Sequence, residues 1–440
     1  MTTPGTGCPF HPSPASGPAG SPSTSRDRGV SRRGLFGGAL GAAASAPAAV
    51  LLAGAARGDS PSPSGSGVEV TDGAASYPFH GEHQAGILTP QQSAAAYVSF
   101  DVTAEDRAGL RELLQTLTTT ARFLTSGGTP PDDGLLATAW DNGVVGPEVA
   151  ADGLTVTASV GSSLFDDRFG LAKAKPARLR PMDEFPNDAL DRSICDGDLL
   201  LQLCAHHPDT VNHAVRQLMR TTRGGLQVRW RQDGFQSPPR PSGTPRNLLG
   251  FKDGTANPSV DDAKLMDDLV WTHGGGAEPA WVEGGSYHVV RKIRMLVEFW
   301  DRVSVREQET MFGRDKASGA PLTGAEEFDD PDFGKDATGE VIRFDAHIRL
   351  ANPRTVDTEK QRFLRRSFNY DAGTDPNGQL DMGLVFTAFN QDLERQFVTV
   401  QKRLIDEPLV DYISPVGGGY FFALPGVRSE DDWFGREMFT

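Results

Sequence analysis

Two successive parts of this 440-residue chain repeat one order of predicted elements: strand, helix, strand, strand, helix, strand. From runs of β-branched, aromatic and apolar residues for strands, and from apolar residues at helical spacing, we place the first set at residues 96–102, 110–117, 154–160, 198–205, 208–221 and 226–231. The second set falls at residues 287–299, 303–312, 345–350, 383–389, 391–404 and 419–423. This repeat predicts an α+β fold of two tandem ferredoxin-like βαββαβ units, each an antiparallel sheet with helices on one face.

The N-terminal part of the chain carries a targeting pattern. Residues 31–36 read S-R-R-G-L-F, a twin-arginine signature, and an apolar run rich in Ala and Gly follows, with small residues suited to cleavage around 53–56. Because glycines and Pro47 interrupt this run, we predict no integral membrane span after removal of the signal. The chain is therefore divided into a signal region (1–59), a flexible linker (60–76), an N-terminal unit (77–245) and a C-terminal unit (246–440).

Charge and cysteine content exclude several classes of protein. The formal net charge of -15 argues against a nucleic-acid partner, because phosphate binding requires a surplus of Lys and Arg. Three cysteines are too few for a disulfide framework, and no C-x-x-C-H motif is present for covalent haem attachment. Cys195 and Cys204 flank a strand that we predict to be buried, so we expect free thiols there, with a disulfide between them as the alternative.

The nine histidines offer few candidates for a metal ligand. No H-x-x-x-H or H-E-x-x-H helix is present, so a zinc hydrolase has no support. Residues 80, 83, 206 and 207 are histidines without a recognisable metal-binding spacing, which makes a copper or iron binding protein a minor alternative. His347 stands in D-A-H-I-R-L-A-N-P-R, and a histidine in such a setting, taken alone, is more often a structural or surface residue than a ligand.

Two further segments place charged residues in unusual settings. Asp253 lies between glycines in G-F-K-D-G-T-A-N-P, which suggests a tight loop that projects a carboxylate, although Asp-Gly is also common in surface turns. Arg365 and Arg366 lie between apolar residues in F-L-R-R-S-F-N-Y. One buried ion pair and one surface charge would explain the arginines equally well.

Together, the motifs G-x-x-D-G, H-I-R-L-A-N-P-R and L-R-R-S-F-N-Y resemble those of the dye-decolorizing peroxidase family, in the same order and at similar spacings. The stretch G-E-H-Q-A-G-I at residues 81–87 resembles the exported branch that includes bacterial deferrochelatase/peroxidase proteins. The resemblance covers nearly all of the predicted folded body. It implies a haem-dependent peroxidase that binds one non-covalent haem b per chain in its C-terminal unit.

The resemblance also implies roles for individual residues. His347 would be the axial ligand of the haem iron, and Asp392 either the carboxylate that accepts its other N–H or merely a helix N-cap. Asp253 would act as acid and base on peroxide, and Arg365 would stabilise the developing charge. The remaining candidate cofactor contacts are Arg349 and the backbone of Gly254, Thr255 and Ala256 for the propionates, and Leu384, Phe386 and Phe389 for the walls. Arg349 could equally be a surface residue of a strand, and core packing would explain the three wall residues as well.

The expected partners are hydrogen peroxide and an organic electron donor, such as a dye or a phenol. A bulky donor would be oxidised at a surface aromatic residue, for which the candidates are Trp271, Trp281, Tyr370, Tyr412 and Tyr420. Two other functions keep the haem: release of its iron with the tetrapyrrole intact, as a deferrochelatase, and delivery of haem without turnover by an exported carrier. We expect an exported protein, extracellular, periplasmic or associated with the cell wall, as a monomer or a homo-oligomer.

Overall fold

The computed structural model describes residues 75–132 and 134–440. The twin-arginine pattern and almost all of the linker lie outside the described residues. No helix in the described part is both long and apolar enough to cross a membrane.

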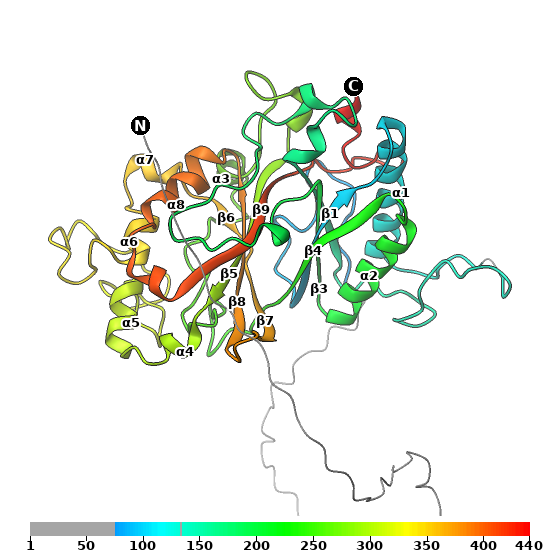
Figure 1. Cartoon of the computed structure of the whole chain (residues 1–440). Helices are drawn as coiled ribbons and strands as arrows, with labels where there is room; N and C mark the ends of the chain where they lie inside the picture. Colours follow the sequence, from blue (N-terminus) through cyan, green and yellow to red (C-terminus); the bar gives the residue numbers. More distant parts are fainter. Residues whose placement is uncertain (1–74, 133) are drawn as a thin grey trace, which may run out of the picture. The chain divides into compact units, whose positions relative to one another are not determined.

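The first half of the described chain forms a ferredoxin-like unit. Its elements are β1 (Ala94–Val102), α1 (Arg107–Ser126), β2 (Thr155–Gly161), β3 (Leu199–Ala205), α2 (Pro208–Thr221) and β4 (Leu226–Phe235). The strands are antiparallel in the order β2-β3-β1-β4, and the helices α1 and α2 lie side by side with their apolar residues against one face of this sheet (Figure 1). The first predicted βαββαβ unit is therefore confirmed.

The second half repeats this arrangement with additional short helices. Its elements are α3 (Ala263–Leu269), β5 (Ser286–Met295), α4 (Val297–Trp300), α5 (Val305–Phe312), α6 (His347–Ala351), α7 (Val356–Glu359), β6 (Leu364–Arg365), β7 (Phe368–Thr374), β8 (Leu380–Asn390), a π-helix (Glu394–Val398), α8 (Thr399–Arg403) and β9 (Ile413–Ala423). The strand order is β9-β5-β8, and β8 also pairs with both β7 and β6. The predicted duplication is thus present in the structure.

The two sheets join edge to edge into a closed barrel. Strand β2 pairs with β9, β4 pairs with β7, and the pairing of β5 with β8 closes the ring. Residues such as Tyr97, Leu200 and Phe368 fill the inside of the barrel, while the alternate residues of each strand pack against the helices. Helices α1 and α2 lie on one side of the strands and α5, α6 and α8 on the other (Figure 1).

One predicted strand is wrong. Residues 345–350 do not join the sheet; the helix α6 begins at His347, and the second strand of this unit is instead formed by β6 and β7. Alternation of Ala346, Ile348 and Leu350 with polar residues imitates a strand, but the segment packs against α5 and α8 on the outside of the sheet. The predicted strand 287–299 also ends early, at Met295, where α4 follows.

Both described cysteines are buried free thiols, as expected, and do not form a disulfide. Burial is the main reason why the pKa of the Cys195 thiol is raised to about 11. At neutral pH this thiol is therefore protonated and a poor nucleophile.

Candidate haem and peroxide site

A cavity of about 260 Å³ lies between strands β5, β8 and β9 and helices α6 and α8. Its walls are largely apolar, with side chains contributed by both the sheet and the helices: Leu249, Ile293, Met295, Phe312, Leu384, Phe386, Val400, Leu404 and Leu409. Polar and charged side chains also reach the cavity, among them His347, Asp253 and Arg365. An apolar cavity with a few convergent polar groups is typical of a cofactor site.

His347 reaches the cavity from the first turn of α6. Its Nδ1 lies 2.6 Å from Oε2 of Glu407, a carboxylate whose side chain is only 3% exposed. An ionised carboxylate can only accept, so Nδ1 carries the proton and Nε2 presents a lone pair. Burial lowers the pKa of His347, but the negative charge and hydrogen bond of Glu407 outweigh that effect, so the pKa lies above its usual value. A histidine oriented in this way by a carboxylate is the usual form of a metal-ligating histidine.

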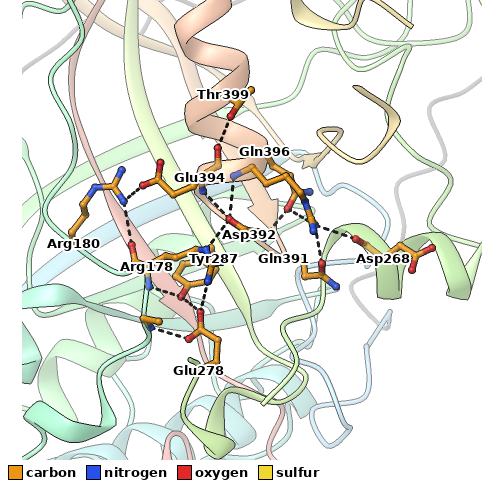
Figure 2. Close-up of polar contacts among 12 residues, drawn as sticks. Arg178, Arg180, Asp268, Glu278, Tyr287, Gln391, Asp392, Glu394, Gln396 and Thr399 are labelled. Carbon is orange, nitrogen blue, oxygen red and sulfur yellow. Dashed lines mark hydrogen bonds and ion pairs between the residues drawn. The ribbon is translucent and has the colours of Figure 1, made fainter. Parts of the chain in front are cut away.

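The carboxylate predicted for this role, Asp392, is wrong. Figure 2 shows it in a different polar cluster, where its Oδ1 lies 2.9 Å from Nε of Arg178. The same oxygen accepts hydrogen bonds from the backbone N–H groups of Glu394 and Arg395, so the helix-capping alternative is the correct one. Glu407 had no signal in the sequence, because it follows His347 by 60 positions in a segment without a motif.

Asp253 is held at the end of a tight hairpin. The backbone N–H of Asn247 donates to the carbonyl of Phe251, that of Asp253 donates to the carbonyl of Pro245, and Gly254 adopts a φ of +118° that favours glycine. At this point the carboxylate of Asp253 meets the guanidinium of Arg365, with 2.9 Å between Oδ1 and Nη1. The two residues predicted from separate motifs are therefore paired at the cavity wall.

A second, polar cavity of about 140 Å³ borders the same pair. It shares Asn247, Asp253, Gly254, Asn257, Arg365 and Leu384 with the main cavity. Its other lining residues are mostly polar: Gln91, Gln236, Thr244, Pro245, Arg246, Ser367 and Asn369. The charged pair is thus accessible from an apolar cavity on one side and from a polar one on the other.

The other predicted cofactor contacts divide into two groups. Gly254, Thr255, Ala256, Leu384 and Phe386 line the main cavity, but Arg349 and Phe389 do not. Arg349 donates to Asp336 and to the carbonyl of Ile342 on the far side of α6, because residues two apart on a helix point in different directions. Phe389 follows Phe386 by three positions on β8, so its side chain faces the opposite side of the sheet. There it stacks on the buried ring of His288.

Several cavity residues were not found from the sequence. Besides Arg291 and Arg365, three further arginines line the cavity and could pair with carboxylates of a ligand: Arg314, Arg354 and Arg362. Arg354 belongs to the quoted H-I-R-L-A-N-P-R segment, and its φ of +57° is uncommon for a residue with a side chain. Its place in this motif was the feature of the sequence from which Arg354 could have been predicted to line the cavity.

These residues fit a haem. A flat tetrapyrrole requires apolar walls, cations for its propionates and a ligand for its iron, and the cavity offers candidates for all three, with Nε2 of His347 as the candidate ligand atom. The acid–arginine pair is contributed by the hairpin and β6, whereas the histidine comes from α6. Fold and site together define a haem peroxidase of the α+β barrel type.

Comparisons with known proteins identify the family. The chain matches the Dyp-type peroxidase N-terminal family over residues 84–236 and the C-terminal family over residues 244–428. The deferrochelatase of Escherichia coli K12 is 53% identical over 366 residues, which are 82% of this chain and 86% of that protein. That of Shigella flexneri is 52% identical over 82% of this chain and 87% of its own length. The chain belongs to the Dyp-type peroxidase family.

Solved structures agree with this assignment. A DyP-type peroxidase from Cellulomonas bogoriensis is 38% identical with a TM-score of 0.74, over 83% of this chain and 98% of that one. Ferric DtpA from Streptomyces lividans is 35% identical with a TM-score of 0.75, over 83% and 97%. The chain is therefore an oxidoreductase that acts on peroxide, and its cofactor is a non-covalent haem b.

Proposed function

We propose that this chain reduces hydrogen peroxide with Asp253 as acid–base catalyst and Arg365 as the stabiliser of developing charge, while His347, oriented by Glu407, holds the cofactor. The observation that carries the proposal is the Asp253–Arg365 pair at the wall of a cavity that also receives Nε2 of His347. Haem, when bound, supplies the iron centre that exchanges electrons with peroxide. A carrier of haem has no need of such a pair.

The chain's own residues account for the movement of the proton. The carboxylate of Asp253, paired with Arg365, takes the proton from one peroxide oxygen and returns it to the other, so that the departing oxygen leaves as water. Arg365 presents a guanidinium that is already charged to the oxygen on which negative charge accumulates as the O–O bond breaks. The polar second cavity gives a small, polar peroxide a route to this pair that excludes a bulky dye.

The test of the proposal is a spectroscopic comparison of the haem-loaded protein before and after one equivalent of hydrogen peroxide. We expect a rapid change in the visible spectrum, followed by return to the starting spectrum when a phenolic donor is added. Absence of any change would contradict the proposed peroxide reaction.

Release of iron from haem is the second candidate function, favoured by the relatives named deferrochelatase. It would leave a metal-free porphyrin, which fluoresces, and iron that a coloured chelator detects. Appearance of both products without added peroxide would favour this function over peroxide reduction.

For bulky donors, the structure favours one of the five aromatic candidates. Trp271, Trp281, Tyr370 and Tyr420 are buried, whereas Tyr412 is partly exposed. The ring of Tyr412 lies 5.1 Å from that of Trp300, which is 5.9 Å from Phe312, which in turn is 5.9 Å from His347. We propose that a bulky donor gives up an electron at Tyr412, and that this row of rings carries it to the cavity.

Replacing Tyr412 with phenylalanine is expected to lower the turnover of a bulky dye several-fold, because the substitution removes the phenol hydroxyl that makes this partly exposed side chain oxidisable. The peroxide step, measured by stopped flow without a donor, is expected to be unchanged. Tyr77→Phe is the matched control, since Tyr77 is a half-buried tyrosine of the N-terminal unit that does not line the main cavity. An equal loss of dye turnover in both variants would refute a special role for Tyr412.

Export by the twin-arginine route completes the proposal. The pattern S-R-R-G-L-F supports it, together with the apolar run that follows. Replacing Arg32 and Arg33 with lysine is the direct test, and retention of the protein in the cytoplasm of the host is the result expected.

A further inference from the structure

The side-chain amide of Asn257 binds both backbone polar groups of Arg365. Its Nδ2 donates to the carbonyl oxygen of Arg365 at 2.7 Å, and its Oδ1 accepts from the backbone N–H of Arg365 at 3.1 Å. The two residues are 108 positions apart in the sequence. Asn257 lines both the apolar and the polar cavity, so this contact lies at the boundary between them.

The backbone of Arg365 needs such a partner because of its place in the sheet. Among the described residues, strand β6 stands at the edge of the sheet and pairs on one side only, with β8. Arg366 donates its N–H to Thr387 of β8, and N–H groups alternate in direction along a strand, so the N–H of Arg365 points away from the sheet. The amide of Asn257 takes the place of a missing neighbouring strand for this one residue.

The same asparagine is coupled to Asp253 through a short turn. The backbone N–H of Asn257 donates to the carbonyl of Gly254 at 2.9 Å, which closes a turn directly after Asp253. The loop that carries the carboxylate is thus fastened to the strand that carries the guanidinium, and the carboxylate and guanidinium meet at 2.9 Å. A shift of β6 by a fraction of this distance would separate them.

We propose that Asn257 is a positioning residue for the peroxide reaction, whose amide fixes the backbone of Arg365 at the place where its guanidinium meets Asp253. The inference rests on the proposed roles of Asp253 and Arg365, and assigns to Asn257 no contact with peroxide. It explains why the loop continues as T-A-N-P beyond G-x-x-D-G, since the amide must reach back to β6.

The first test is a kinetic cycle on the haem-loaded protein. Asn257→Leu keeps the size of the side chain but removes both hydrogen bonds, and is expected to slow the reaction with peroxide roughly 10- to 100-fold, the scale of a misplacement near 1 Å. Asn257→Asp keeps only the hydrogen-bond acceptor, so its rate of reaction with peroxide is expected to lie between the rates of the natural protein and of Asn257→Leu. Because Asn257 acts through Arg365, adding Asn257→Leu to a protein that already carries Arg365→Leu is expected to lower the rate of reaction with peroxide by less than about twofold. The same large loss in both backgrounds would overturn the proposal.

The second test does not depend on activity. Hydrogen exchange is expected to accelerate at the backbone amide of Arg365 in Asn257→Leu, with or without haem. Asn390→Leu is the matched control, because Asn390 is a buried asparagine that donates to two backbone carbonyls, those of Tyr287 and Ala388, outside both cavities. It should lower thermal stability without altering exchange at Arg365 or the peroxide rate. Unchanged exchange at Arg365 in Asn257→Leu would refute the inference. A failure of the proposed function would give a different result, because Arg365→Leu alone would then react with peroxide at the rate of the natural protein.

Discussion

Replacement of His347 with alanine is expected to abolish tight haem binding, because Nε2 of His347 is the proposed ligand atom of the iron and His347 lines the cavity. Loss of a partner behind a metal ligand lowers affinity by about 10- to 100-fold, so loss of the ligand itself should exceed about 100-fold. The protein should still fold, since α6 is a short surface helix and His347 supports no strand of the barrel. Titration of the apoprotein with haem, followed in the Soret band, gives the affinity, and circular dichroism gives the fold.

Two controls make this result specific. Glu407→Gln keeps the shape of the side chain but removes the negative charge behind His347, and is expected to lower haem affinity by about 10- to 100-fold and to shift the Soret band. His288→Gln tests a buried histidine that stacks on Phe389 and does not line the cavity, so haem binding should be unchanged. Normal haem affinity in His347→Ala would show that another residue binds the iron.

The fold was readable from the sequence because most strands bury two different faces. In β1, Ala94 and Val98 pack against the helices while Ala95 and Tyr97 fill the barrel, so period-two alternation and a run of apolar residues both mark the strand. Helix α2 was predicted with its observed bounds, since Pro208 stands in its first turn and its apolar residues recur at helical spacing. Closure of the two sheets into one barrel depends on pairings between the units, which no local pattern encodes.

One local error produced a second error at the site. In a strand, Arg349 would share a face with His347, and a propionate contact beside the ligand was a reasonable inference. In the observed helix α6 the residue two positions on points away, toward Asp336. Five residues are too few to show a helical period, and the cap residue Ala346 gives no capping signal. The short helix was therefore indistinguishable from a strand by pattern alone.

The proposed catalytic pair and the proposed iron ligand could be identified from sequence motifs, whereas the residues that hold them in place could not. Asp253, His347 and Arg365 lie in recognisable segments, and the structure brings all three to one cavity. Glu407 and Asn257 act across 60 and 108 positions of sequence. Their roles depend on how the elements pack, because a carboxylate or an amide acquires a partner only when the tertiary structure brings that partner within hydrogen-bonding distance.

The second large expected effect is on the rate of the reaction with hydrogen peroxide. Asp253→Asn removes the base but keeps a polar group of the same shape beside Arg365, and should slow the reaction with hydrogen peroxide by about 10²- to 10⁴-fold. Arg365→Leu removes a preorganised charge and should cost about 10²- to 10³-fold. Stopped-flow absorbance of the haem-loaded variants, mixed with peroxide in the absence of donor, gives the second-order rate constant of this step alone.

Asp392→Asn is the matched control for these variants, because Asp392 is a carboxylate of the same unit that pairs with Arg178 and does not line the cavity. Its rate should stay within about twofold of the natural protein, as is usual for changes away from the reacting groups. Residues that act as one unit are not additive, so the double variant of Asp253 and Arg365 should be only slightly slower than the slower single variant. If the two losses multiplied in full, the ion pair between these side chains would be incidental, and each would act on peroxide independently of the other. If Asp253→Asn reacted at the natural rate, the proton would have to be moved by another group, and Asp253 would be left with the task of orienting Arg365.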